Sequence, residues 1–125
     1  MARPISGDYS RTKGVFVVED DIKGKVFKLK DLVGFQEESI VSRTIIDRPE
    51  GTVTLFAFDE GQALSEHSAP YDALVTVVEG KLEVKLGGKP NEVNAGESII
   101  MPAGVPHALR AISQAKMLLV MVRGS

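Results

Sequence analysis

The polar and apolar positions of this chain alternate over short runs and follow no sustained helical period. The clearest run is residues 81–86, KLEVKL, in which charged and apolar side chains take turns. Successive side chains of a strand point to opposite faces, so this run predicts a strand with one wet and one buried face. The glycines at 87–88 can take the positive φ angles of a tight hairpin turn. Similar runs of Val, Ile, Leu, Phe and Thr predict strands at 25–32, 39–47, 52–59, 62–67, 73–79, 81–86, 89–94, 98–101, 107–112 and 116–122.

Glycine, proline and acidic residues mark the breaks between these strands. Residues 46–51 and 59–61 read as turns, and residues 31–38 leave room for one helical turn at most. Residues 1–14 predict a loose arm or an exchanged edge strand, which leaves 15–125 as one domain. About ten short strands in one domain must protect their edges, and closing into a barrel does so. The sequence therefore predicts an all-β fold, a single small barrel or jelly roll.

Length, composition and charge narrow the class of protein further. The chain has 125 residues, of which 43% are hydrophobic and 26% charged, which indicates one globular domain with its own core. A formal charge of −2 argues against nucleic-acid binding and against a polybasic membrane anchor. No apolar run approaches the roughly twenty residues of a membrane helix, and the start has no signal-peptide core. We therefore expect a cytoplasmic protein that does not bind membranes.

The chain offers few side chains for chemistry. It has no cysteine, which excludes disulfides, thiolate catalysis and cysteine-ligated zinc. It has two histidines, His67 and His107, so any imidazole site must use one or both. Each lies in a segment, 61–80 or 96–111, in which glycine and proline stand at fixed offsets around it.

These two segments resemble the motifs of the cupin superfamily, G-x5-H-x-H-x3-E-x6-G and G-x5-P-x-G-x2-H-x3-N. In the second segment Gly96, Pro102, Gly104 and His107 all stand at the family spacing, and residues 116–122 are similar to the closing strand of small single-domain cupins. The resemblance implies a double-stranded β-helix, the jelly-roll barrel of small cupins. It also implies a homodimer paired through edge strands, for which residues 1–32 could supply one.

The resemblance also implies a metal site, although this chain departs from the pattern. By the family spacing, His67 and His107 are the first and fourth ligands of a divalent ion such as Zn, Ni, Mn or Fe. The second ligand position is Ala69 and the carboxylate position is Ala73. Two imidazoles alone would hold a metal weakly or not at all, because catalytic zinc and ferrous iron usually have three protein ligands.

Neighbouring side chains are candidates to complete the site. If the chain is extended from His67 to Ala73, alternate residues including Tyr71 share a face, and Asp72 points outward unless Pro70 introduces a kink. Tyr71, Asp72 or a bound small molecule would then supply the missing metal ligands. Three apolar residues are predicted core positions that could also line an interior pocket: Phe56, Phe58 and Met101.

Three functions remain open, and the sequence does not decide whether the protein is an enzyme. The first is a metal-dependent cupin enzyme of dioxygenase or isomerase type, with the metal on His67 and His107. The second is a metal-free enzyme resembling sugar epimerases, in which one histidine is a general base oriented by Asp72. The third is a non-catalytic sensor that captures a small ligand in the barrel. We favour a two-histidine interior site that binds a small molecule, a weakly held divalent metal, or both.

Overall fold

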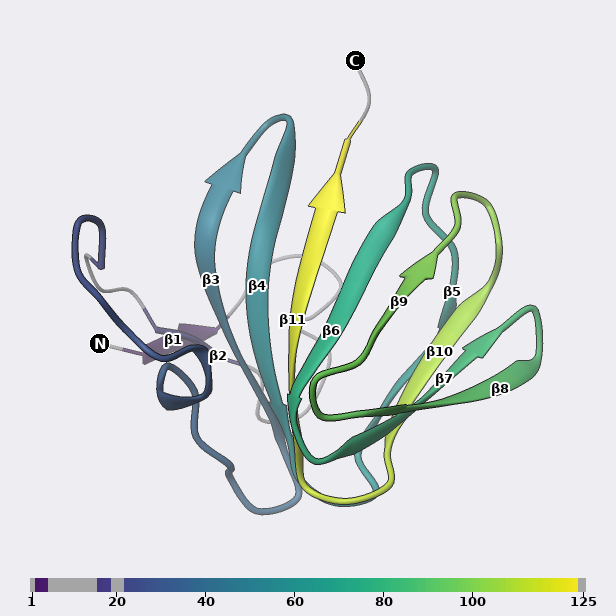
Figure 1. The fold of residues 1–125 in the computed structure, drawn as a ribbon, viewed down its shortest axis with the longest axis horizontal. Coiled ribbons are helices and arrows are strands. Elements are labelled where there is room, and N and C mark those ends of the chain that lie inside the picture. The colour runs from purple at the N-terminus through teal and green to yellow at the C-terminus, as the bar shows by residue number, and fades with distance from the viewer. Residues whose placement is uncertain (1, 5–15, 19–21, 124–125) are drawn as a thin grey trace.

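The strands between residues 40 and 122 form two facing antiparallel sheets (Figure 1). In the computed structural model, residues 2–4, 16–18 and 22–123 are described. One sheet has five strands in the order β3-β4-β11-β6-β9, and the other has four in the order β5-β10-β7-β8. The strands of the two sheets are β3 (Ile40–Arg48), β4 (Gly51–Phe58), β5 (Ala63–His67), β6 (Ala73–Glu79), β7 (Lys81–Leu86), β8 (Lys89–Asn94), β9 (Ser98–Met101), β10 (His107–Ala111) and β11 (Ala115–Val122).

This arrangement is the predicted all-β jelly-roll barrel. The strands expected from 39–47 onward are confirmed, with bounds that shift by one residue at most. Of the expected arm at 1–14, only Ala2–Pro4 lies within the described residues; it forms β1 and pairs with β2 (Phe16–Val18), which lies alongside β3. No helix in the described part of the chain is long and apolar enough to cross a membrane.

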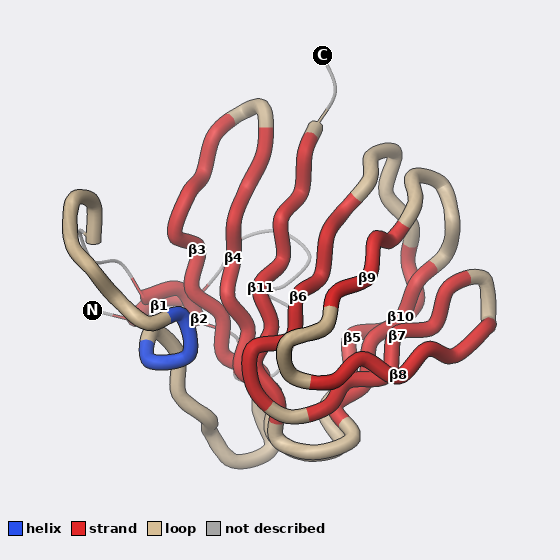
Figure 2. Tube along the Cα trace, viewed as in Figure 1, coloured by secondary structure: helices blue, strands red, loops and turns tan. Residues whose placement is uncertain are grey.

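The strand predicted at 25–32 is wrong. This segment has no strand partner and contains instead a short 3-10 helix, η2 (Leu29–Asp31), drawn in blue in Figure 2. Two of its apolar residues, Leu29 and Leu32, pack on the outer face of the five-stranded sheet, whereas Val26 and Phe27 are exposed. We call residues 29–35 the strap. It forms a second apolar cluster with the sheet, made of Leu29, Leu32, Val33, Phe35, Val41, Leu55, Ala57 and Leu118.

Polar contacts hold the strap on the sheet. Arg43 donates from Nη1 to the carbonyl oxygen of Leu32 at 3.1 Å. Lys116 donates from Nζ to the carbonyl oxygen of Lys30 at 2.7 Å, and the same ammonium lies 4.9 Å from the centre of the Phe35 ring. Backbone carbonyls of an unpaired segment need donors when they lie against a sheet, and these long side chains supply them.

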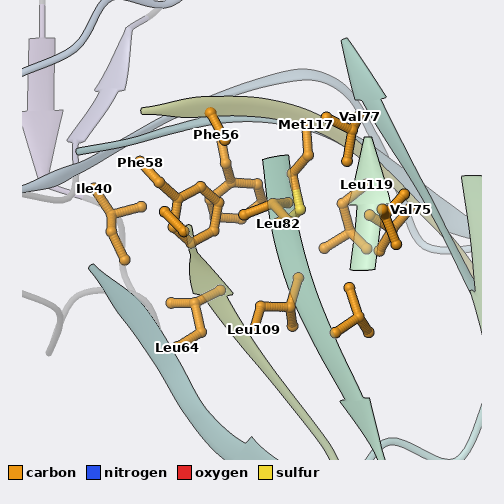
Figure 3. Packing of buried hydrophobic residues seen from close by; sticks show 14 of the residues in the cluster. Ile40, Phe56, Phe58, Leu64, Val75, Val77, Leu82, Leu109, Met117 and Leu119 are labelled. Carbon is orange, nitrogen blue, oxygen red and sulfur yellow. The ribbon is translucent and has the colours of Figure 1, made fainter. Parts of the chain in front are cut away.

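The main core lies between the two sheets (Figure 3). Phe56 and Phe58 alternate on the inner face of β4, with their ring centres 6.1 Å apart. Leu64 and Leu109 approach them from the four-stranded sheet. Alternation places these residues inside, since every second residue of a strand faces the same way. β5 ends and β10 begins with a histidine, at the end of the barrel that carries loops 68–72 and 102–106.

Candidate ligand and metal site

The structure brings the two histidines into contact. His67 is the last residue of β5 and His107 the first residue of β10, and the two are directly opposite in the antiparallel pairing. Their Nε2 atoms are 3.1 Å apart. The ring centres are 4.4 Å apart, with the rings inclined at 73°. Residues forty positions apart in the sequence therefore form one imidazole pair.

Strand geometry explains the position of the pair. His107 shares the inner face of β10 with Leu109 and Ala111 and is buried. His67 is exposed, and the β5–β10 register shifts between His107 and Leu109, as at a β-bulge. The pair stands beside loops 68–72 and 102–106, at the end of the barrel where the strands splay apart (Figure 1). We call this the open end.

A hydrogen-bond chain sets the roles of the ring nitrogens. His67 Nδ1 lies 2.9 Å from the carbonyl oxygen of Ser65, which can only accept, so this nitrogen carries a hydrogen. In the neutral ring, His67 Nε2 is then an acceptor, and the hydrogen between the rings belongs to Nε2 of His107. His107 Nδ1 is buried and has no hydrogen-bond partner among the described residues. The pair thus keeps a polar atom without a partner inside the barrel.

Burial lowers the pKa of His107 below its ordinary value of 6.5, because the charged ring loses hydration. The proximity of His67 lowers the pKa of His107 further, and the backbone of Val105 offsets part of the effect. These effects favour the neutral form of His107 over the charged form. A neutral imidazole can accept a proton or bind a metal, whereas a charged one can do neither.

The lowered pKa of His107 predicts a loss of stability in mild acid. The unfolded chain binds a proton at His107 more readily than the folded chain, so the free energy of unfolding falls as pH drops from about 6.5 toward the lowered pKa. Urea unfolding at about pH 7.5 and about pH 5.0 measures the effect. His107→Gln should show a smaller fall between these two pH values. Equal falls in both proteins would contradict the assignment.

The carboxylate of Asp72 contacts the backbone of a neighbouring loop and not the two histidines. The chain is not extended from His67 to Ala73, because β5 ends at His67 and residues 68–72 form a loop. The expectation that these residues alternate on one face is therefore wrong. Asp72 is exposed, and its Oδ1 accepts a hydrogen bond of 2.8 Å from the backbone N–H of Ala103. The carboxylate joins the two loops beside the histidines.

The other residues predicted for the site differ in burial. Tyr71 is half-buried, and the guanidinium of Arg123 lies 6.0 Å from its ring centre. Met101 is buried on β9 opposite Ala73. Phe56 and Phe58 have no exposed surface and belong to the core.

Sequence reasoning missed a set of hydroxyl groups on the inner face of β3 and β4. Thr44 and Thr54 are opposite in the register, and their hydroxyl oxygens are 3.1 Å apart. Thr52 is buried, and its Oγ1 has no hydrogen-bond partner among the described residues. The signal was the spacing, since residues 52 and 54 continue the alternation of Phe56 and Phe58 and must face the interior with them.

The donor set of the imidazole pair fits half of a metal site. Two nitrogens that bind one zinc ion each lie about 2.0–2.1 Å from it. With an N–Zn–N angle near 100°, the two nitrogens would be about 3.1 Å apart. The observed Nε2 separation matches this value. The described residues nevertheless hold no group of three or more His, Cys, Asp or Glu side chains able to bind one ion. Within the part of the chain that the structure describes, no third side chain of these types therefore joins the pair as in an ordinary catalytic metal centre.

Fold and site together define a small jelly-roll barrel with an imidazole pair at its open end. The chain belongs to the cupin family: residues 54–123 match the family model described as a cupin domain. This segment contains both histidines and every strand of the four-stranded sheet. The cupin resemblance noted in the sequence is thus confirmed.

Solved structures of relatives support the assignment. A conserved protein of unknown function from Streptococcus pyogenes is 37% identical, with a TM-score of 0.79 over 86% of this chain and 92% of that one. A cupin 2 conserved barrel domain protein from Leptotrichia buccalis is 42% identical, with a TM-score of 0.75 over 78% of this chain and 47% of that one. These similarities establish the fold and the family but leave the activity open.

A curated relative is also similar in sequence. The protein called polyketide synthase CurC, from Streptomyces cyaneus, is 26% identical in an alignment of 99 residues, and the match covers 74% of this chain. The chain spans about two thirds of that relative, 64% of its length.

Proposed function

We propose that this protein is a small-molecule-binding cupin whose ligand contacts the imidazole pair of His67 and His107 at the open end of the barrel. The single observation that carries the proposal is the pair itself, with its Nε2 atoms facing one another at 3.1 Å. One ring is buried, which favours its neutral form, and the other is exposed. A ligand can therefore reach the pair from solvent and replace the hydrogen bond between the two rings with hydrogen bonds of its own.

The surroundings of the pair favour a ligand with both apolar and oxygen-bearing parts. Ala69 and Ala73 stand where metal-dependent cupins have ligands, so these positions are less polar than in those relatives. On the facing sheet, Thr44 and Thr54 add hydroxyl groups to the inner face. The similarity to a protein named as a polyketide synthase makes oxygenated polyketide-like compounds a reasonable class to test.

A divalent metal is a second candidate ligand, favoured by the spacing of the two Nε2 atoms. Two protein ligands leave the ion dependent on water or on the small molecule for its remaining donors. We therefore expect weak binding of Zn, Ni, Mn or Fe without a small molecule. The metal-free enzyme resembling sugar epimerases has less support, because the carboxylate of Asp72 is bound to the backbone of Ala103.

Metal loading tests the imidazole pair directly. The untagged protein and a His67→Ala/His107→Ala variant are incubated with zinc, nickel, manganese or ferrous ions, dialysed, and analysed for metal. The wild type should retain less than one ion per chain, and the variant none. Isothermal titration with resorcinol, a neutral ring bearing two hydroxyls, tests the small-molecule site in both proteins, with toluene as the control. If the variant binds resorcinol as tightly as the wild type does, and also retains as much metal, the proposal is overturned.

A further inference from the structure

The inner face of β3 and β4 changes from apolar to hydroxyl-bearing along the strands. In the second half of β4, the inner residues are Phe56 and Phe58, which belong to the core. In the first half, the same alternation places Thr52 and Thr54 on the inner face, and both are buried. Thr44 of β3 lies opposite Thr54, and the two hydroxyl oxygens are 3.1 Å apart. We call Thr44, Thr52 and Thr54 the threonine patch.

The threonine patch lies at the same end of the barrel as the imidazole pair. β4 runs from Gly51 to Phe58 and is followed, after residues 59–62, by β5, which runs back to His67. The start of β4 and the last residue of β5 are therefore both at the open end, where Figure 1 also shows the β3–β4 hairpin. The two strands belong to facing sheets. A molecule that enters the open end thus meets hydroxyl groups on one sheet and imidazole rings on the other.

The patch has hydroxyl hydrogens that its own contacts do not use. Thr44 and Thr54 share one hydrogen bond, which needs a single hydrogen, so the two residues keep a second hydrogen to donate. Thr52 is only 9% exposed, yet its hydroxyl oxygen has no hydrogen-bond partner among the described residues. A buried hydroxyl without a partner lowers the free energy of unfolding, so its presence calls for an explanation other than folding.

The charges near the patch favour a neutral hydrogen-bond acceptor in the ligand. The exposed residue Asp47 lies opposite Thr52 in the register of β3 and β4. The two basic residues of β3, Arg43 and Arg48, fall on the other face by alternation, and Arg43 is bonded to the strap there. An anionic group at the patch would therefore meet a carboxylate and find no cation on this face of β3 or β4. A carbonyl oxygen accepts hydrogen bonds without carrying a charge.

We propose that the threonine patch is a second contact for the ligand of the imidazole pair, and that it binds a neutral carbonyl oxygen. This inference rests on the proposed function and adds the class of ligand, a neutral molecule with a hydroxyl group at one end and a ketone at the other. A hydroxyl group donates and accepts, as the two Nε2 atoms require. Facing sheets lie about 10 Å apart, so one ring and a short chain can join the two ends. Leu119 and Met121 flank the patch on β11 and suit an apolar body.

Isothermal titration with a matched pair of probes tests the patch. In para-hydroxybenzylacetone, two methylenes join a phenol to a methyl ketone, and para-butylphenol lacks only the ketone oxygen. The affinity for the ketone relative to butylphenol should fall about 5- to 10-fold in Thr52→Val, because one neutral hydrogen bond is lost. Thr52→Ser keeps the hydroxyl and should keep the wild-type ratio. The matched control is Thr76→Val, the same substitution on the outer face of β6, which should also keep it.

A charged probe tests the preference for a neutral group. In para-hydroxyphenylpropionate, a carboxylate oxygen replaces the methyl group of the ketone, so the two molecules have nearly the same shape. The wild type should bind this carboxylate at least about tenfold more weakly than the ketone, because the charge loses water and gains no cation at the patch. Equal affinity for the two would contradict the assignment of a neutral acceptor.

Urea unfolding without ligand gives a readout that a purely structural hydroxyl would not give. Thr52→Val should unfold at the same or a higher urea concentration than the wild type, because it removes a buried polar group that has no partner. Thr54→Val breaks the bond to Thr44 and should unfold at a lower concentration. A clearly lower midpoint for Thr52→Val would show that its hydroxyl has a partner in the folded chain, and would overturn the inference.

The histidine variant separates this inference from the proposed function. His67→Ala/His107→Ala should bind both probes more weakly than the wild type. If it does, and Thr52→Val keeps the wild-type ratio of the two affinities, the threonine patch has no part in binding and the proposed function stands. If the histidine variant binds both probes as tightly as the wild type, the proposed function fails, and this inference fails with it.

Discussion

Phe56→Ala is expected to lower the free energy of unfolding by about 3–5 kcal/mol, as for other buried phenylalanines cut back to alanine. Phe56 has no exposed surface and lies in the middle of β4, opposite Ser42 on one neighbouring strand and Met117 on the other. Its loss removes apolar contacts and leaves a cavity that strands hydrogen-bonded on both sides cannot close.

Urea unfolding at one fixed protein concentration measures this effect. Phe56→Leu is the matched control, because it keeps part of the apolar volume at the same position. We expect it to destabilise the protein clearly less than Phe56→Ala does. Equal destabilisation by the two variants would mean that the volume of the ring is not what the core requires, and would contradict the assignment.

Gly80→Ala is expected to lower the free energy of unfolding by roughly 3 kcal/mol, the second large effect. Gly80 is the single residue between β6 and β7, where the chain passes from the five-stranded to the four-stranded sheet. Its φ angle is +77°, which costs a residue with a side chain about 1–2 kcal/mol. A Cβ there would also overlap the carbonyl oxygen of Gln114 and lie 2.9 Å from the Cα of Ala115. Overpacking of this kind adds about 1–3 kcal/mol.

Gly88→Ala separates the two causes. Gly88 has a φ angle of +84°, but a Cβ there would meet no atom within 4 Å. This variant should therefore show the cost of the backbone angle alone, about 1–2 kcal/mol. Thermal and urea unfolding of both variants give the difference. If the two substitutions cost the same, the close approach of residues 114–115 to Gly80 has no energetic weight.

The sequence predicts most of the fold because each strand carries its own local pattern. Residues 81–86 alternate between charged and apolar, and the strand Lys81–Leu86 has the predicted bounds. Residues 25–32 are also rich in apolar side chains and do not form a strand. An apolar content of this kind shows only that part of a segment can be buried. Whether the apolar side chains meet a neighbouring strand or lie on the surface of a sheet depends on contacts distant in the sequence.

The candidate site could be predicted only in part. The spacing around His67 and His107 singled out both residues, but their separation depends on the pairing of β5 with β10, which no local pattern encodes. The position of Asp72 was not predictable from strand alternation, because β5 ends five residues earlier than that argument requires. The unpartnered hydroxyl of Thr52 follows from burial, which a sequence shows only indirectly.

The loops beside the histidines are fastened to one another, and this bears on the entropy of ligand capture. Gly104 donates from its backbone N–H to the carbonyl oxygen of Ala69, and Gly87 donates likewise to that of Pro106, both at 2.8 Å. With the bond from Ala103 to Asp72, these contacts link residues 68–72, 87–88 and 102–106 into one rim. A rim already ordered before binding loses little conformational freedom when a ligand arrives. A ligand that binds here must match an entrance whose shape is set before the ligand arrives.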